Sequence, residues 1–123
     1  MTTWDSTRWP NFTEQEVACS HCGELGVTED ALDTLQALRT AIQKPMTINS
    51  GYRCPEHNQA IGGAKKSYHV RGLAFDISLQ GHDKDELSAS AQEAGFTGFG
   101  YYDTFLHLDT GPSRVWGNKR SGY

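Results

Sequence analysis

Apolar and polar residues follow a helical period in one part of the chain and a strand period in another. Between Thr28 and Gln43 the apolar positions share one face of a helix that ends before Pro45. These positions are Leu32, Leu35, Leu38 and Ile42. From residue 74 to residue 79 bulky apolar residues alternate with smaller or polar ones, which predicts a strand with one face toward the core. Asp76 falls on the other face, so we expect its carboxylate to point away from the core packing.

Shorter segments complete a mixed set of helices and strands. Thr13 and Glu16 have the spacing of a capping box, which predicts a short helix there. Pro55 suits the first position of another helix, and Gly95 closes a helix predicted over residues 83–94. Strands are predicted over residues 46–49, 99–102 and 105–109, the last two joined as a hairpin. The tail from residue 110 is predicted to be irregular. Together these elements predict an α+β domain with a small antiparallel sheet and flanking helices.

The composition is that of one globular domain. A chain of 123 residues, with 37% hydrophobic and 21% charged residues, fits a single domain over residues 1–123. The net charge of −4 and the lack of a Lys/Arg run argue against a nucleic-acid partner. No stretch approaches the roughly 18 apolar residues of a membrane span. The first residues lack a basic start followed by an apolar run, so we expect no secretory signal, and we expect a monomer.

Two histidines and an aspartate stand at spacings that suit a metal site. His69 falls on a predicted loop, and Asp76 lies seven residues later in a predicted strand. His107 lies on a later strand, with Asp109 on the same face. Two imidazoles and one carboxylate from separate elements make a three-ligand zinc set with a fourth position open for water, as catalytic zinc sites have. The same residues also fit a loop histidine and a hydrogen-bonded strand carboxylate, so spacing alone leaves both interpretations open.

Three cysteines and a histidine form a second candidate group. Cys19 and Cys22 make one pair with two intervening residues, and Cys54 and His57 make another. Two such pairs match the ligands of a closed structural zinc site. A metal there would tie the N-terminal turn to the segment that carries Arg53 and would stabilise a small domain. Three reduced cysteines and a disulfide within the first pair are the alternatives.

Several motifs resemble those of the M15 peptidases, the zinc D-alanyl-D-alanine carboxypeptidases and their endopeptidase relatives, which include many phage endolysins. The pattern S-x-H-x-x-G-x-A-x-D is met by Ser67, His69, Gly72, Ala74 and Asp76. The later H-x-D of residues 107–109 resembles the motif that closes the site in one branch of the family, the branch typified by its subfamily A. Residues 50–53 (S-G-Y-R), 56–58 (E-H-N) and 62–64 (G-G-A) also resemble family motifs. The resemblance covers roughly residues 12–109 and implies the fold shared by these DD-peptidases and the hedgehog signalling domain.

The resemblance implies a role for each matched residue. The zinc ligands would be His69, Asp76 and His107. Arg53 would contact the substrate or stabilise an oxyanion, a role that suits a guanidinium because it stays charged and forks onto oxygens. A surface salt bridge is the simpler interpretation of Arg53. Two further residues would line the substrate cleft or only shape its loop: Ser67 and Tyr68.

The general base is the point where this chain departs from the family pattern. Better-known branches carry a Glu or Asp three residues before the last histidine, and here that position is Thr104, which cannot act as a base. The candidates are Asp103, in the turn, and Asp109, on the face of His107. We expect Asp103 to be the base and Asp109 to support a ligand from behind. Asp109 could also replace His107 on the metal.

The sequence therefore predicts a zinc-dependent peptidase that hydrolyses bonds in bacterial peptidoglycan stem peptides or cross-links, as a carboxypeptidase or an endopeptidase. A phage-type lysin, made in the host cytoplasm and released to the wall by a holin, fits the expected lack of a signal. A hedgehog-like, zinc-containing binding module without clear peptidase activity is the main alternative. A virion component that opens the wall locally is a third interpretation. Turnover of purified peptidoglycan distinguishes an enzyme from a binding module.

Overall fold

A five-stranded sheet forms the centre of the computed structural model, which describes residues 3–62 and 67–117. In sheet order the strands are β1 (Ile48–Ser50), β2 (Ala74–Ser78), β4 (Phe105–Asp109), β3 (Gly98–Tyr101) and β5 (Arg114–Gly117). The first three neighbouring pairs are antiparallel, and β5 pairs with β3 in parallel. The fold is therefore mixed α+β, as the sequence predicts. The last two residues of the G-G-A motif, 63 and 64, lie outside the described residues.

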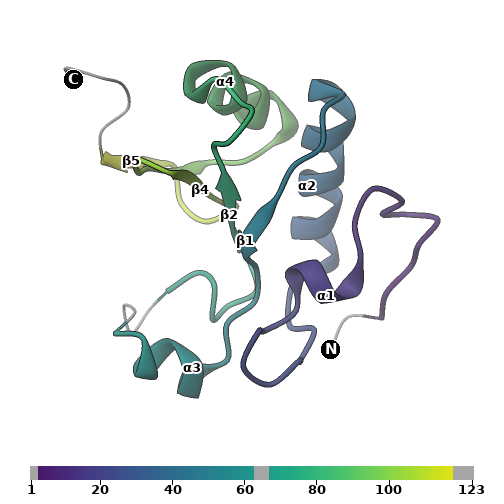
Figure 1. Cartoon of the computed structure of the whole chain (residues 1–123), viewed down its shortest axis with the longest axis vertical. Helices are drawn as coiled ribbons and strands as arrows, with labels where there is room; N and C mark the ends of the chain where they lie inside the picture. Colours follow the sequence, from purple (N-terminus) through teal and green to yellow (C-terminus); the bar gives the residue numbers. More distant parts are fainter. Residues whose placement is uncertain (1–2, 63–66, 118–123) are drawn as a thin grey trace.

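Four helices accompany the sheet: α1 (Glu14–Val17), α2 (Glu29–Ile42), α3 (Pro55–Ala60) and α4 (Lys84–Ala94). In Figure 1, α2 and α4 lie beside each other, whereas α3 stands apart at the other end of the molecule with the loop that leads to β2. The buried apolar cluster includes side chains of α2, α4 and the sheet, among them Leu32, Leu35, Leu87, Phe75 and Leu106. The two long helices therefore pack against the sheet through this apolar cluster.

Local sequence signals explain where the two long helices begin and end. The Thr28 hydroxyl accepts from the Ala31 backbone N–H (3.2 Å), and the Asp83 carboxylate accepts from the Glu86 N–H (3.0 Å), so each helix has an N-cap. The helix α4 is closed by Gly95 at φ +121°, as predicted. The predicted capping box also forms, because the Glu16 carboxylate accepts from the Thr13 N–H at 2.8 Å.

Two expectations about the sheet need correction. The tail after Thr110 is not irregular, because residues 114–117 form β5, and the sheet is consequently not purely antiparallel. The segment has no apolar alternation to reveal it, since Val115 is exposed and lies on an edge strand whose pairing with β3 is long-range. The first strand also begins at Ile48, two residues later than predicted. Among the described residues, no helix is long and apolar enough to cross a membrane.

The register of β2 and β4 and one tight turn bring the candidate residues together. Asp76 pairs with His107 across the two central strands. Before β2, Gly72 turns the chain at φ +74°, and a Cβ there would lie 2.0 Å from the Gly26 carbonyl oxygen. Only glycine fits that position. The turn places His69 beside the strand that carries Asp76.

Candidate metal centre

Three potential metal ligands converge at the junction of the 67–73 loop with β2 and β4. His69, Asp76 and His107 each offer one ligand atom, and these atoms all lie within 4.8 Å of one another. Asp76 Oδ1 is 3.2 Å from His69 Nε2 and 3.1 Å from His107 Nδ1. All three residues are buried, although they come from a loop and two strands. The structure thus assembles the three residues that the sequence singled out.

The second nitrogen of each imidazole is held by a hydrogen-bond acceptor. His69 Nδ1–H donates to the Gly51 carbonyl (2.8 Å), and His107 Nε2–H donates to Asp109 Oδ2 (2.7 Å). Because a neutral imidazole carries one hydrogen, these bonds leave the lone pairs on His69 Nε2 and His107 Nδ1, the atoms that face Asp76. Acceptors behind metal-binding histidines are the usual means of fixing the tautomer and the ring orientation.

This donor set fits zinc. With Zn–N and Zn–O bonds of about 2.0–2.2 Å, the edge of a tetrahedral site measures about 3.3–3.5 Å. The observed separations of 3.1 and 3.2 Å between Asp76 Oδ1 and the two imidazole nitrogens are close to that edge. Two neutral nitrogens and one carboxylate oxygen would leave one tetrahedral position for another ligand.

Electrostatics favour an ionised Asp76 in this place. Burial raises the pKa of the carboxyl, but in the metal-free protein, where the facing ring nitrogens can carry a hydrogen, the contacts with His107 and His69 outweigh it and hold the pKa at about 2. Burial lowers the pKa of His107. Asp109 and Asp76 raise this pKa by more than burial lowers it, so the pKa of His107 lies above its usual value. Without a metal, a proton on His107 neutralises part of this negative charge, and a metal ion would compete with that proton.

Behind His107, Asp109 joins the site to β5 through Arg114. Asp109 is fully buried, and its oxygens accept from Arg114 Nη1 (3.0 Å), Arg114 Nη2 (2.8 Å) and the Gly111 N–H (3.0 Å). Burial raises the pKa of Asp109, but the donors His107, Arg114 and Gly111 bring it to about 2. Arg114 was missed by the sequence reasoning, because the segment that carries it was predicted to be irregular.

A hollow of about 570 Å³ opens in front of the three ligands. It is lined by Arg53, Ser67, Tyr68, His69, Asp76, Tyr102, Phe105, His107, Arg114 and Trp116. The three residues predicted to meet the substrate are therefore among its lining. Aromatic side chains form another part of it: the rings of Tyr102 and Phe105 stack at 4.4 Å, and Trp116 Nε1–H donates to the Tyr102 hydroxyl (2.9 Å). No motif in the sequence identified this aromatic wall.

Arg53 reaches the hollow from the segment before α3. Its Nη1 donates to Asn58 Oδ1 (2.9 Å), and its backbone N–H donates to the His69 carbonyl (3.2 Å). The guanidinium is partly buried. Its side-chain hydrogen bond runs to a neutral amide, so its positive charge is not neutralised by that partner. A fixed cation next to the three ligands is suited to an anionic group.

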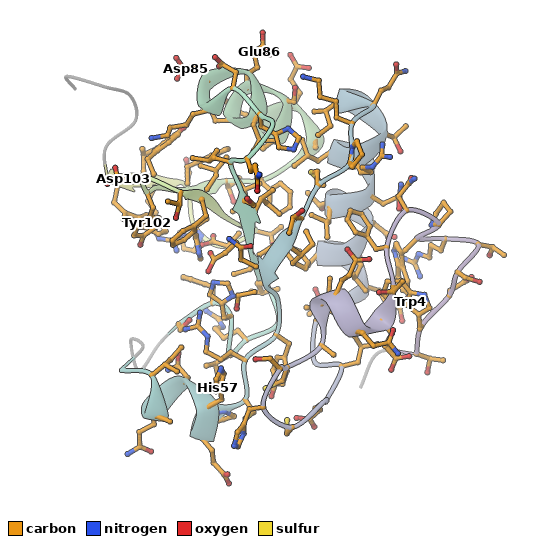
Figure 2. All side chains as sticks on the ribbon, in the orientation of Figure 1. Trp4, His57, Asp85, Glu86, Tyr102 and Asp103 are labelled. Atoms are coloured by element: carbon orange, nitrogen blue, oxygen red, sulfur yellow. The ribbon has the colours of Figure 1, made fainter. Side chains whose placement is uncertain are left out.

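The two candidates for a general base occupy different surroundings. Asp103 is exposed in the turn between β3 and β4, next to Tyr102, as Figure 2 shows. It is not among the residues that line the hollow, although its neighbour Tyr102 is. Asp109 lies behind His107 and has no exposed surface.

The three cysteines also gather, close to the start of α3. The sulfur atoms of Cys19, Cys22 and Cys54 lie within 4.8 Å of one another, and all three are free thiols. Cys54 is the N-cap of α3 and its sulfur accepts from the His57 backbone N–H (3.4 Å). His57, the predicted fourth ligand, therefore contacts a thiol through its backbone, and its ring stacks on His21 at 5.5 Å.

Comparisons with known proteins agree with this arrangement. The chain is 38% identical over 94 residues to the peptidoglycan L,D-endopeptidase MepK of Escherichia coli K12, covering 71% of this chain and 51% of that protein. It is 36% identical over 88 residues to the zinc D-Ala-D-Ala carboxypeptidase of Streptomyces albus G, covering 67% and 34%. The chain thus spans about half or less of the length of these curated relatives. Residues 10–109 match the sequence profile of the family described as Peptidase M15. With most of its length inside that match, the chain belongs to the M15 peptidase family.

Proposed function

We propose that this protein is a zinc-dependent peptidase that hydrolyses peptide bonds in bacterial peptidoglycan. The observation that carries the proposal is the convergence of His69, Asp76 and His107 on one point beside a hollow that also contains the Arg53 cation. The relatives named above support the substrate class, since one is a peptidoglycan endopeptidase and another a zinc D-Ala-D-Ala carboxypeptidase.

Each ligand residue has a defined task in this proposal. His69 and His107 would hold zinc through Nε2 and Nδ1, and Asp76 would hold it through a carboxylate oxygen. Zinc supplies a Lewis acid, which polarises a carbonyl group and acidifies water. The Gly51 carbonyl and Asp109 keep both rings in the binding orientation, because each accepts the hydrogen of the opposite ring nitrogen.

Other residues of the hollow would bind and orient the substrate. Arg53 would pair with a carboxylate of the peptide or with the oxyanion that develops during hydrolysis, since its charge is fixed and accessible from the hollow. Ser67 and Tyr68 would contact the peptide from the loop side. The stacked pair of Tyr102 and Phe105 would exclude water on the other side.

For the general base we keep Asp103. Asp103 is exposed and directly follows Tyr102, which lines the hollow, so this role requires its carboxylate to turn toward the hollow. Asp109 would instead act as a positioning residue, because its carboxylate is buried behind His107 and is already saturated with donors.

A zinc-containing binding module with a hedgehog-like fold is the second candidate. It is favoured by one observation: among the described residues that line the hollow, Asp76 is the only carboxylate. If the protein is an enzyme, we further propose that it is a phage-type lysin that is released to the wall by a holin. It would act as a monomer and have either carboxypeptidase or endopeptidase specificity.

The test is turnover of purified peptidoglycan together with zinc per chain. The wild type should release peptides or D-alanine, lose this activity on chelation and regain it with zinc. His69→Ala should lose both activity and one zinc. His82→Ala is the matched control, because His82 hydrogen-bonds the Pro45 carbonyl away from the hollow. Full zinc loading without any turnover would favour the binding module, and an unchanged zinc content in His69→Ala would refute the site.

A further inference from the structure

We propose that Cys19, Cys22, Cys54 and His21 bind a second, structural zinc ion near the N-terminus of α3. This site is independent of the peptidase proposal, because it shares no residue with the His69, Asp76 and His107 group. The three sulfur atoms come from two segments more than thirty residues apart and still lie within 4.8 Å of one another.

The spacing of the sulfurs suits a tetrahedral metal. With Zn–S bonds of about 2.3 Å, neighbouring sulfurs of a tetrahedral site are about 3.8 Å apart. A group confined within 4.8 Å therefore needs only small side-chain rotations to close on one ion. Two of the thiols are buried and one is exposed, so the ion would have a route of entry from the side of Cys22.

His21 is the fourth ligand that the geometry favours. Its Nδ1 lies 3.5 Å from Cys54 Sγ, and the edge between sulfur and nitrogen in a tetrahedral zinc site is about 3.6 Å. His21 is not within 4.8 Å of the whole group, so its exposed side chain must rotate toward it. The sequence pattern instead pairs Cys54 with His57. That residue contacts the Cys54 sulfur through its backbone N–H, and its ring packs on the ring of His21.

Backbone N–H groups donate to two of the three sulfur atoms. The Cys54 backbone N–H donates to Cys19 Sγ (3.4 Å), and the His57 N–H donates to Cys54 Sγ (3.4 Å). Donors directed at sulfur stabilise negative charge there, which metal binding requires.

The ion would connect the loop after α1 to the segment that carries Arg53, a residue that lines the hollow. Cys19 belongs to the loop after α1, and Cys54 directly follows Arg53. These segments already touch, because the Tyr52 N–H donates to the Val17 carbonyl at 2.8 Å. The adjacent Gly51 leaves no room for a Cβ, which would lie 2.4 Å from that same oxygen. A metal between the segments would restrict the position of Arg53.

The experiment uses the full chain with His69→Ala, in which the first site is disabled and any bound metal reports on the thiols. We expect about one zinc per chain, and a sulfur-to-cobalt charge-transfer band after Co²⁺ replacement. Adding Cys22→Ser should remove both, and adding Ser20→Ala, in the same exposed loop, should change neither. Cys22 is exposed, so its replacement leaves the core intact.

A second measurement does not need the His69→Ala background. In the wild type, the thiols should resist alkylation until a chelator is added, because zinc protects its thiolates. His21→Asn should abolish this protection and His57→Asn should preserve it. Absence of metal and unprotected thiols in reduced protein would overturn the proposal, as would a disulfide between Cys19 and Cys22 in freshly purified protein. Loss of metal in His57→Asn alone would overturn the assignment of His21.

Discussion

Replacing Asp109 with asparagine tests whether the residues behind His107 organise the metal centre. One carboxylate oxygen faces His107 Nε2 and Arg114 Nη2, and the other faces the Gly111 N–H and Arg114 Nη1. An asparagine keeps one oxygen and presents an NH₂ group at the other position. In either orientation the amide hydrogens point at donors, so two contacts are lost and two donors are left unpaired.

The magnitude follows from burial. Removing one partner of a buried charged pair costs about 3–5 kcal/mol, but the Arg114 side chain is 33% exposed, and water can solvate it after the change. We therefore expect the free energy of unfolding to fall by about 2–4 kcal/mol. For a chain of this size that lowers Tm by roughly 6–20 °C. Zinc affinity should fall by roughly 10–100-fold, because His107 loses the acceptor that fixes its tautomer.

The pH dependence has a defined sign. The pKa of Asp109 is lowered from 3.8 to about 2, so the stability it contributes is present above 3.8 and is lost as pH falls through about 2. The pKa of His107 is raised from 6.5, so its contribution is full below 6.5 and is lost as pH rises through the folded value. The difference in unfolding free energy between wild type and Asp109→Asn should therefore be largest near pH 5, in metal-free protein.

The assays are urea unfolding of the metal-free protein across this pH range and zinc affinity by chelator competition. Asp33→Asn is the matched control, because Asp33 also receives two nitrogens of an arginine, Arg8, but on the exposed surface. That variant should leave zinc affinity unchanged and alter stability far less. Equal stability and equal zinc affinity in Asp109→Asn and wild type would refute the reasoning.

Three further substitutions test other parts of the account. Arg53→Met should lower kcat/KM on peptidoglycan peptides by roughly 100-fold with zinc content unchanged, because a fixed charge in the hollow is lost; wild-type kinetics would contradict its role. Asp103→Asn should lower kcat by roughly 100-fold or more, whereas Asp85→Asn on α4, which does not line the hollow, should not; equal rates for the two would exclude Asp103 as the base. Gly72→Ala should destabilise the fold by about 3 kcal/mol or more, because its φ is +74° and its Cβ would meet the Gly26 oxygen. Gly62→Ala, at φ +75° in open space, should cost only about 1 kcal/mol in the same urea titration.

Local signals in the chain specify much of the secondary structure and the membership of the site. The apolar period of α2, the caps at Thr28 and Asp83 and the closing Gly95 are such signals, and local interactions decide where these helices begin and end. The motif spacing also singled out His69, Asp76 and His107, which the fold brings within 4.8 Å of one another. The three thiols that the sequence grouped also lie within 4.8 Å of one another, although C-x₂ spacing by itself only keeps Cys19 and Cys22 within one turn of chain.

Features that depend on long-range pairing are set only in the folded chain. Residues 114–117 became a strand only because they pair with β3, and this pairing carries Arg114 to Asp109 and Trp116 to the hollow. A short, half-exposed edge strand has no apolar period from which it could be predicted. Folding likewise brings the His21 imidazole to the Cys54 sulfur across 33 residues of sequence, while the neighbouring His57 contacts that sulfur through its backbone N–H. Local sequence determines which residues are available as ligands. The sheet pairing and the loop contacts determine which of their atoms face one another, because these atoms belong to segments that are remote in the chain.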